Sequence, residues 1–139
     1  QVRYNNQNGG FQKLFNYISG KNQNSKKIEM TTPVTQYAFG NQQVMQFYLP
    51  DRFDQNSAPL PLNDAVEVAS IKSGYFAVIR YSGFASDKNF IKHVNILKDA
   101  LLKEKIEFKD PPIKATYNGP FTLPNLRRNE AMYLINWIN

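Results

Sequence analysis

The stretch YFAVIRYSGFASDKNFIKHVNILKDALLKEK, residues 75–105, contains a strand pattern, a helix cap and a helix pattern in direct succession. Its first seven residues are rich in aromatic and β-branched side chains, which is typical of a β-strand. Ser86 and Asp87 can cap a helix that begins after them. Apolar residues then recur at helical spacing at Phe90, Val94, Leu97 and Leu101. The stretch therefore predicts a strand over 75–81 and a helix from about 87 to 105.

Two further strands are predicted downstream of this helix. Pro111 and Pro112 are expected to break the chain, because proline lacks the N–H that both helices and ladders use. Residues 113–117 and 131–137 then have strand composition, and a proline-containing loop over 118–128 separates them. The second half of the chain is thus predicted to be a βαββ unit.

The first half has a similar but less complete pattern. Phe11, Leu14, Phe15 and Ile18 fall at i, i+3, i+4 and i+7, which predicts a helix over about 10–19. The expected strands cover residues 28–39, 43–49 and 66–71, with a long loop over 51–65. Ahead of the helix there is space for only a short strand. We infer an α+β fold in which a βαββ unit is used twice, with the opening strand of the first copy shortened or missing. The length of 139 residues is typical of one domain, which we place over 1–139.

Composition excludes several classes of site. The chain has no cysteine and a single histidine, so thiolate chemistry and a site built from several His or Cys are excluded. No apolar run approaches the length of a membrane span. The formal net charge is +6, but the basic residues are dispersed and no nucleic-acid motif accompanies them. A chain without cysteine is compatible with cytoplasmic and exported locations alike.

His93 is a candidate metal ligand because imidazole is a common axial ligand of haem iron. On a helical wheel it lies about 60° from Phe90, at the flank of the apolar stripe. Residues in such places are more often boundary histidines that make one hydrogen bond. Both interpretations of His93 remain open from the sequence.

The loop YNGPFTLPNLRRNE, residues 117–130, is the least ordinary stretch. It places Phe121 and Leu123 between two prolines, which stiffen a loop that displays apolar side chains. Arg127 and Arg128 follow, and guanidinium groups pair with carboxylates in forked geometry. The alternative is that one arginine pairs with Glu130 and the other is solvated.

Four blocks of this sequence resemble the SOUL haem-binding family, and they occur in the family's order over nearly the whole chain. They are GFQKLFNYISGKN (10–22), KIEMTTPVTQY (27–37), YFAVIRYSGFAS (75–86) and YNGPFTLPNLRRNEAMYLI (117–135). The last block is closest to bacterial members. The resemblance implies a distorted, partly open antiparallel β-barrel made from two βαββ-like repeats and flanked by two helices, as in GyrI-like proteins.

The resemblance also implies haem or another tetrapyrrole as ligand. The expected groove lies between the first helix and the loop before the last strand. The corresponding residues here are Phe11, Leu14, Phe15, Ile18, Tyr117, Phe121, Leu123, Arg127 and Arg128. Two features differ from the animal members: Lys13 is the only basic residue of the first helix, and no histidine lies near it. The expected function is therefore non-enzymatic carriage or sequestration, with no obligatory axial ligand.

Two other functions are compatible with the same residues. A missing opening strand would expose a sheet edge, which favours self-association or pairing with another chain. A GyrI-like hydrolase would use Tyr117, Glu130 or Tyr133 as acid or base, and a raised carboxyl pKa would indicate it.

Overall fold

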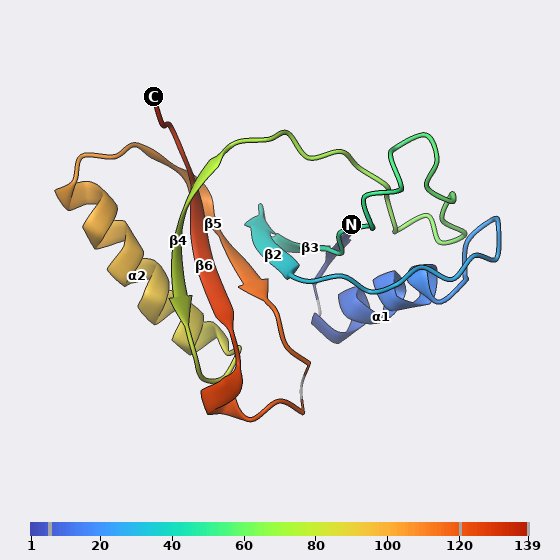
Figure 1. The fold of residues 1–139 in the computed structure, drawn as a ribbon, viewed down its shortest axis with the longest axis horizontal. Coiled ribbons are helices and arrows are strands. Elements are labelled where there is room, and N and C mark those ends of the chain that lie inside the picture. The colour runs from blue at the N-terminus through green and yellow to red at the C-terminus, as the bar shows by residue number, and fades with distance from the viewer. Residues whose placement is uncertain (6, 120, 139) are drawn as a thin grey trace. The chain divides into compact units, whose positions relative to one another are not determined.

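The chain forms two compact units in a computed structural model that describes residues 1–5, 7–119 and 121–138, without the side chains of residues 7 and 8. The units are Gln1–Lys72 and Ser73–Asn139. The first contains β1 (Val2–Tyr4), α1 (Gln7–Ile18), β2 (Val34–Phe39) and β3 (Gln42–Gln46) (Figure 1). The second contains β4 (Tyr75–Tyr81), α2 (Asp87–Lys103), β5 (Phe108–Thr116) and β6 (Asn129–Ile135). The predicted α+β class, with a βαββ unit used twice, is confirmed.

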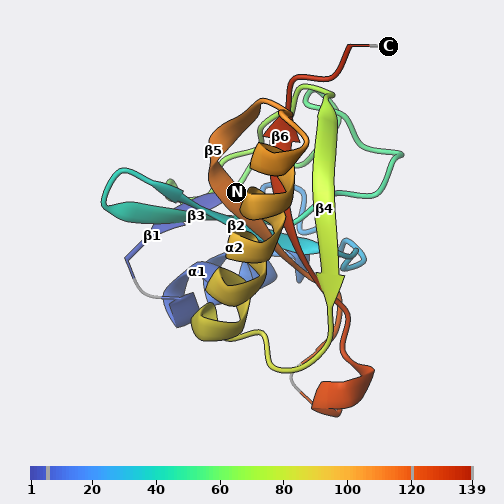
Figure 2. The same ribbon diagram turned by 90° about the vertical axis from the view of Figure 1, so that its left-hand side faces the viewer.

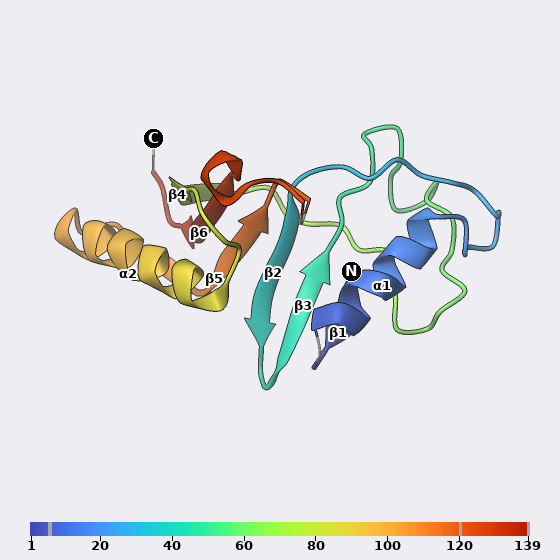
Figure 3. The same cartoon turned by 90° about the horizontal axis from the view of Figure 1, so that it is seen from below.

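The two units share one strand order, which shows the duplication in the topology as well as in the sequence. In each unit the last strand is central and antiparallel to both neighbours: β1–β3–β2 in the first and β4–β6–β5 in the second. The β2–β3 hairpin is visible beside β1 and α1 (Figure 3). Within the second unit, α2 lies along one face of the sheet (Figure 2). The strands within each unit do not close into a ring.

The opening strand β1 has three residues, against seven in β4. Val2 and Tyr4 are buried while Arg3 is exposed, as expected for a strand with one covered face. The outer side of β1 is bridged to Val66 of the same chain. The predicted strand over 66–71 is wrong: only Val66 forms a β-bridge there, and residues 67–71 are not in a strand.

The second unit follows the prediction closely, except at its two prolines. Ser86 caps α2 as predicted, and its side chain accepts a hydrogen bond from the Asn89 backbone. The predicted break at Pro111 and Pro112 is wrong, since β5 continues through both. The register of β5 against β6 shifts between Lys109 and Ile113. The irregularity places the prolines where the ladder does not require their missing N–H groups.

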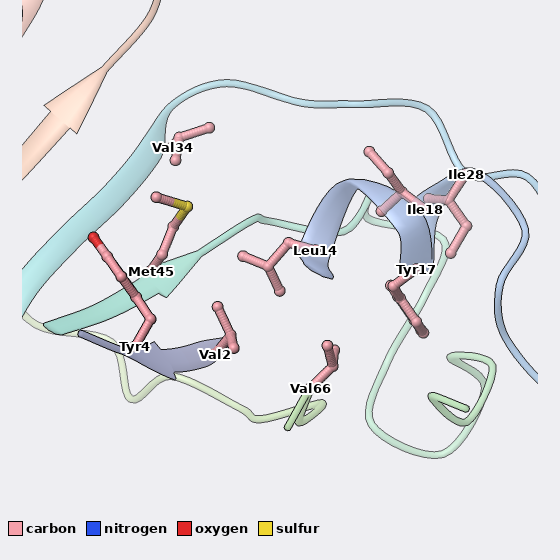
Figure 4. Close-up of a cluster of buried hydrophobic side chains, with 9 residues drawn as sticks. All are labelled: Val2, Tyr4, Leu14, Tyr17, Ile18, Ile28, Val34, Met45 and Val66. Carbon is pink, nitrogen blue, oxygen red and sulfur yellow. The ribbon is translucent and has the colours of Figure 1, made fainter. Parts of the chain in front are cut away.

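Each unit has its own hydrophobic core between its helix and its sheet. In the first, Leu14 of α1 points toward Val2 of β1 and Met45 of β3, and Ile18 lies beside Ile28 (Figure 4). In the second, the buried residues are Tyr81, Val94, Leu97, Leu101, Ala131 and Tyr133. None of the described helices is both long enough and apolar enough to cross a membrane.

Candidate functional site

The apolar stripe of α1 divides into a buried half and an exposed half. Leu14 and Ile18 are 2% and 5% exposed and belong to the core of the first unit, whereas Phe11 and Phe15 are 40% and 42% exposed. The division follows from the helix rotation, because a stripe of four apolar residues is wider than the strip of α1 that the sheet covers. Of the predicted α1 residues, only the two phenylalanines offer apolar surface to a ligand.

The rings of Phe11 and Phe15 form a stacked, half-exposed pair, which we call the aromatic platform. Their rings are stacked at 6.0 Å between centroids with an interplanar angle of 12°. The edge of Phe47, just beyond β3, supports Phe11 at 5.3 Å. Phe47 was not anticipated from the sequence, because its contact with α1 joins residues 36 positions apart. Phe11 therefore has ring contacts with both Phe15 and Phe47.

The loop after β5 forms a second apolar surface, in the other unit. Phe121 is 99% exposed. The loop is fastened to the turn after β4, because the Gly83 backbone N–H donates to the Pro124 carbonyl at 2.8 Å. The short 3₁₀ helix η1 (Pro124–Leu126) lies at this attachment. The exposed apolar residues of the two segments, which we call the loop tip, are Phe84, Phe121, Leu123 and Leu126.

The two arginines of the loop have different roles. Arg128 pairs with Glu130 through two nitrogens, at 3.1 and 2.6 Å, and its guanidinium lies over the Tyr117 ring. This hydrogen-bonded pair holds the pKa of Arg128 above its usual value. Arg127 instead donates from Nε to the Thr122 carbonyl at 2.7 Å, which closes the loop. The pairing of an arginine with Glu130, one of the alternatives that the sequence left open, is therefore observed for Arg128.

A family model described as SOUL heme-binding protein matches residues 1–134, almost the full chain. The chain belongs to the SOUL heme-binding protein family.

Animal members of the SOUL family are similar to this chain over most of its length. Human Heme-binding protein 2 is 32% identical over 135 residues, which are 91% of this chain and 64% of that protein. Mouse Heme-binding protein 2 is 31% identical over 134 residues, with the same shares. Heme-binding protein 1 of Xenopus tropicalis is 25% identical over 131 residues, or 89% of this chain and 68% of that protein. The chain thus spans 64% of the length of its human and mouse Heme-binding protein 2 relatives.

In this SOUL domain, His93 makes one local hydrogen bond, from its position on α2. Its Nδ1 lies 2.7 Å from the Asn89 carbonyl oxygen, and its ring stacks on Tyr81 at 4.0 Å. Of the two ring nitrogens, Nε2 is the one that could ligate a metal ion. The described residues include no group of three or more His, Cys, Asp or Glu side chains placed to hold a metal ion.

The candidate acids and bases of the hydrolase alternative are already engaged. Both carboxylate oxygens of Glu130 have partners, because the Tyr117 hydroxyl donates to Oε2 at 2.8 Å and Arg128 donates to Oε1. Tyr133 is buried against Phe108, and burial raises the pKa of its hydroxyl. Glu130 is thus hydrogen-bonded at both carboxylate oxygens, and Tyr133 belongs to the core of the second unit.

Tyr81→Phe is expected to stabilise the domain most at high pH. The Tyr81 hydroxyl is buried without a hydrogen-bond partner among the described residues, and burial raises its pKa to about 12. The unfolded chain releases this proton near pH 10, so tyrosine ionisation favours unfolding as the pH rises from about 10 to 12. Phenylalanine removes this dependence and the unsatisfied hydroxyl, a gain of about 1 kcal/mol at neutral pH.

Urea denaturation at pH 7 and pH 11 measures this effect, with Tyr75→Phe as the matched control on the same strand. A Tyr81→Phe variant that loses as much stability between the two pH values as the parent would contradict the assignment.

Proposed function

We propose that this SOUL domain binds haem or a related tetrapyrrole non-covalently, for carriage or sequestration, without an obligatory axial ligand. The observation that carries the proposal is the aromatic platform of Phe11 and Phe15, which are stacked on each other and exposed to solvent. The names of the human, mouse and Xenopus relatives as heme-binding proteins support the same ligand class.

The platform suits a flat ligand for a physical reason. A porphyrin has a large apolar face, and its removal from water is favourable by about 25 cal/mol per Å². Rings that are already stacked lose little side-chain freedom when a further aromatic plane packs against them. Because Phe47 supports Phe11, the platform does not need to rearrange on binding.

The loop tip of the second unit is a separate candidate surface for the same class of ligand, with Phe121 and Leu123 as apolar members. Arg127 is the cation that we assign to a propionate carboxylate. The guanidinium of Arg127 lies over the ring of Phe84 in the loop tip, whereas that of Arg128 lies over Tyr117 and pairs with Glu130. Single substitutions in each surface test the two surfaces separately.

Carriage without catalysis fits the same geometry. A carrier needs apolar contact and charge pairing but no available acid or base, and Glu130 and Tyr133 are already engaged. We propose that His93 remains a structural residue stacked on Tyr81, so that metal-free porphyrin and haem bind by the same contacts.

An absorbance titration with haemin tests the proposal. We expect a saturable Soret shift near one equivalent, and a similar affinity for metal-free protoporphyrin. Phe15→Ala should weaken binding by about tenfold, because one stacked aromatic contact contributes about 1 kcal/mol beyond its buried area. Phe39→Ala, which truncates another half-exposed phenylalanine of the first unit, is the matched control and should leave the affinity unchanged.

The same titration separates the alternatives. Arg127→Ala should weaken binding more than Arg128→Ala does. Loss of binding only in His93→Ala would assign the affinity to iron ligation and overturn the platform. Non-saturable adsorption, or equal effects of Phe15→Ala and Phe39→Ala, would remove the case for a specific tetrapyrrole surface.

A further inference from the structure

Strand β4 is an edge strand of the second unit. It pairs with β6 in an unbroken register on one side, and it stands at the end of the strand order, so no described strand pairs with its other side. Its sequence YFAVIRY contains neither proline nor glycine, and Arg80 is its only charged residue. Edge strands are commonly protected against pairing with another chain by lysine, proline or a bulge. β4 carries none of these protections.

Backbone hydrogen bonds at the two ends of β6 show in which direction each residue of β4 faces. Before β6, the Tyr117 N–H donates to the Arg128 carbonyl at 3.3 Å. After β6, the Asn136 N–H donates to the Glu107 carbonyl at 3.0 Å. Even-numbered residues of β6 therefore direct their backbone groups to β5, and odd-numbered residues direct theirs to β4. Their hydrogen-bonded partners in β4 are also the odd-numbered residues, Tyr75, Ala77, Ile79 and Tyr81.

Phe76, Val78 and Arg80 consequently direct their backbone N–H and C=O groups to the free edge of β4. Their side chains lie on the face of the sheet away from α2, because Ala77 and Ile79 between them pack on the core beneath α2. Phe76 is 39% exposed and Val78 is 47% exposed. Among the described residues, the Arg80 side chain has no ion pair, hydrogen-bond partner or ring contact. The edge therefore offers both backbone groups and side chains to a partner.

We propose that the outer edge of β4 binds β4 of a second copy of this chain, in an antiparallel arrangement centred on Val78. A two-fold axis at this residue places Val78 opposite Val78 of the other copy and Phe76 opposite Arg80. These are the outward-facing residues, so each pair exchanges both of its backbone hydrogen bonds. The three-stranded sheets of two copies then join into one continuous sheet.

The side chains of β4 fit an antiparallel copy of β4 in this register. The Arg80 guanidinium meets the Phe76 ring of the other copy, which is a favourable cation–π pair. At the centre, two half-exposed valines pack against each other. A register centred on Arg80 would instead set two guanidinium groups opposite each other and leave Phe76 unpaired. A second copy of the chain is therefore the partner that this edge fits.

Helix α2 offers a further apolar contact at the same edge. The ring of His93 stacks on Tyr81 of β4, which identifies the flank of α2 that lies toward β4. Asp87, on the other flank, pairs with Lys114 of β5. Ile96 lies one turn after His93 on the β4 flank and is half-exposed. Because a two-fold axis perpendicular to the sheet places both α2 helices on one face, Ile96 of each copy lies toward the other helix.

Sedimentation equilibrium with charged variants of Val78 tests the proposal. We expect the parent chain to form dimers as its concentration rises. Val78→Lys should raise the dimer Kd by about tenfold, because it sets two ammonium groups opposite each other, and Val78→Glu should do the same with two carboxylates. An equimolar mixture of the two variants should dimerise again, because lysine then faces glutamate. Ile91→Lys, on the β5 flank of α2, is the matched control and should leave the Kd unchanged.

The result that overturns the proposal is a parent chain that remains monomeric, or a Val78→Lys variant that dimerises as well as Ile91→Lys does. If the mixture of Val78→Lys and Val78→Glu stays monomeric, the two-fold axis does not lie at Val78 and the proposed register is wrong. Haemin affinity is a separate measurement on the platform of the first unit, so this proposal and the proposed function can fail independently.

Amide hydrogen exchange at low and high protein concentration distinguishes this edge from any other interface. The outward-facing amides of Phe76, Val78 and Arg80 should exchange about tenfold more slowly when most of the chain is dimeric. The amides of Ala77 and Ile79 face β6 in both states, so their exchange should respond less. Dimers that form without protection of the three outward-facing amides would refute the pairing of β4 with its copy.

Discussion

Leu14→Ala is expected to lower the free energy of unfolding by about 3 kcal/mol, because it leaves a cavity in the core of the first unit. Leu14 is almost fully buried among Val2, Ile18 and Met45. The apolar side chains around it are anchored on a helix and two strands, so they cannot collapse fully into the space. Urea denaturation followed by far-UV circular dichroism measures the loss.

Phe15→Ala is the matched control, because Phe15 lies one residue away on the same helix. Its ring is half-exposed, and its removal should lower the free energy of unfolding by about 1 kcal/mol at most. Leu14 thus serves stability, whereas Phe15 is the residue that we propose for binding, in spite of their common place in the sequence pattern. Equal stability losses in the two variants would show that α1 does not divide in this way.

Asn22→Ala is expected to cost about 3 kcal/mol, because the side chain satisfies four backbone groups at once. Its amide nitrogen donates to the carbonyls of Tyr17, at 3.0 Å, and Lys26, at 2.8 Å. Its oxygen accepts from the backbone N–H groups of Asn24 and Lys26. Asn22 is 1% exposed, so water cannot replace these bonds without opening the loop.

Two variants sharpen this test by thermal denaturation. Asn24→Ala changes an exposed asparagine of the same loop and should leave the midpoint within about 2 °C of the parent. Asn22→Asp retains the acceptor but loses both donated bonds, so it should be nearly as damaging as Asn22→Ala. A stable Asn22→Ala variant would show that the loop bonds contribute little.

The local elements of the fold were predictable because their signals lie within a few residues of one another. The strand over 75–81 and the cap at Ser86 match the structure, and α2 ends two residues before the predicted position. The stripe on α1 likewise indicated a helix, which begins at Gln7. By contrast, the strand predicted over 66–71 is reduced to a bridge at Val66, because strand pairing depends on residues that are distant in the sequence.

The sequence also provided the candidate site residues, but it did not distinguish exposed from buried side chains or one arginine from the other. Nothing local distinguishes Phe15 from Leu14, or Arg127 from Arg128, since each pair has the same residue class and nearly the same position. The sorting comes from contacts across the fold: the sheet covers Leu14, and the strand that carries Glu130 brings that carboxylate to Arg128.

The sequence by itself determined the family, the α+β class and the repeated βαββ unit, because these follow from residue blocks and from the helical and strand periods. Only the tertiary structure decided which apolar side chains remain exposed and which arginine pairs with Glu130. Each of these depends on residues brought together from distant parts of the chain, and burial and pairing have no local signal in the sequence.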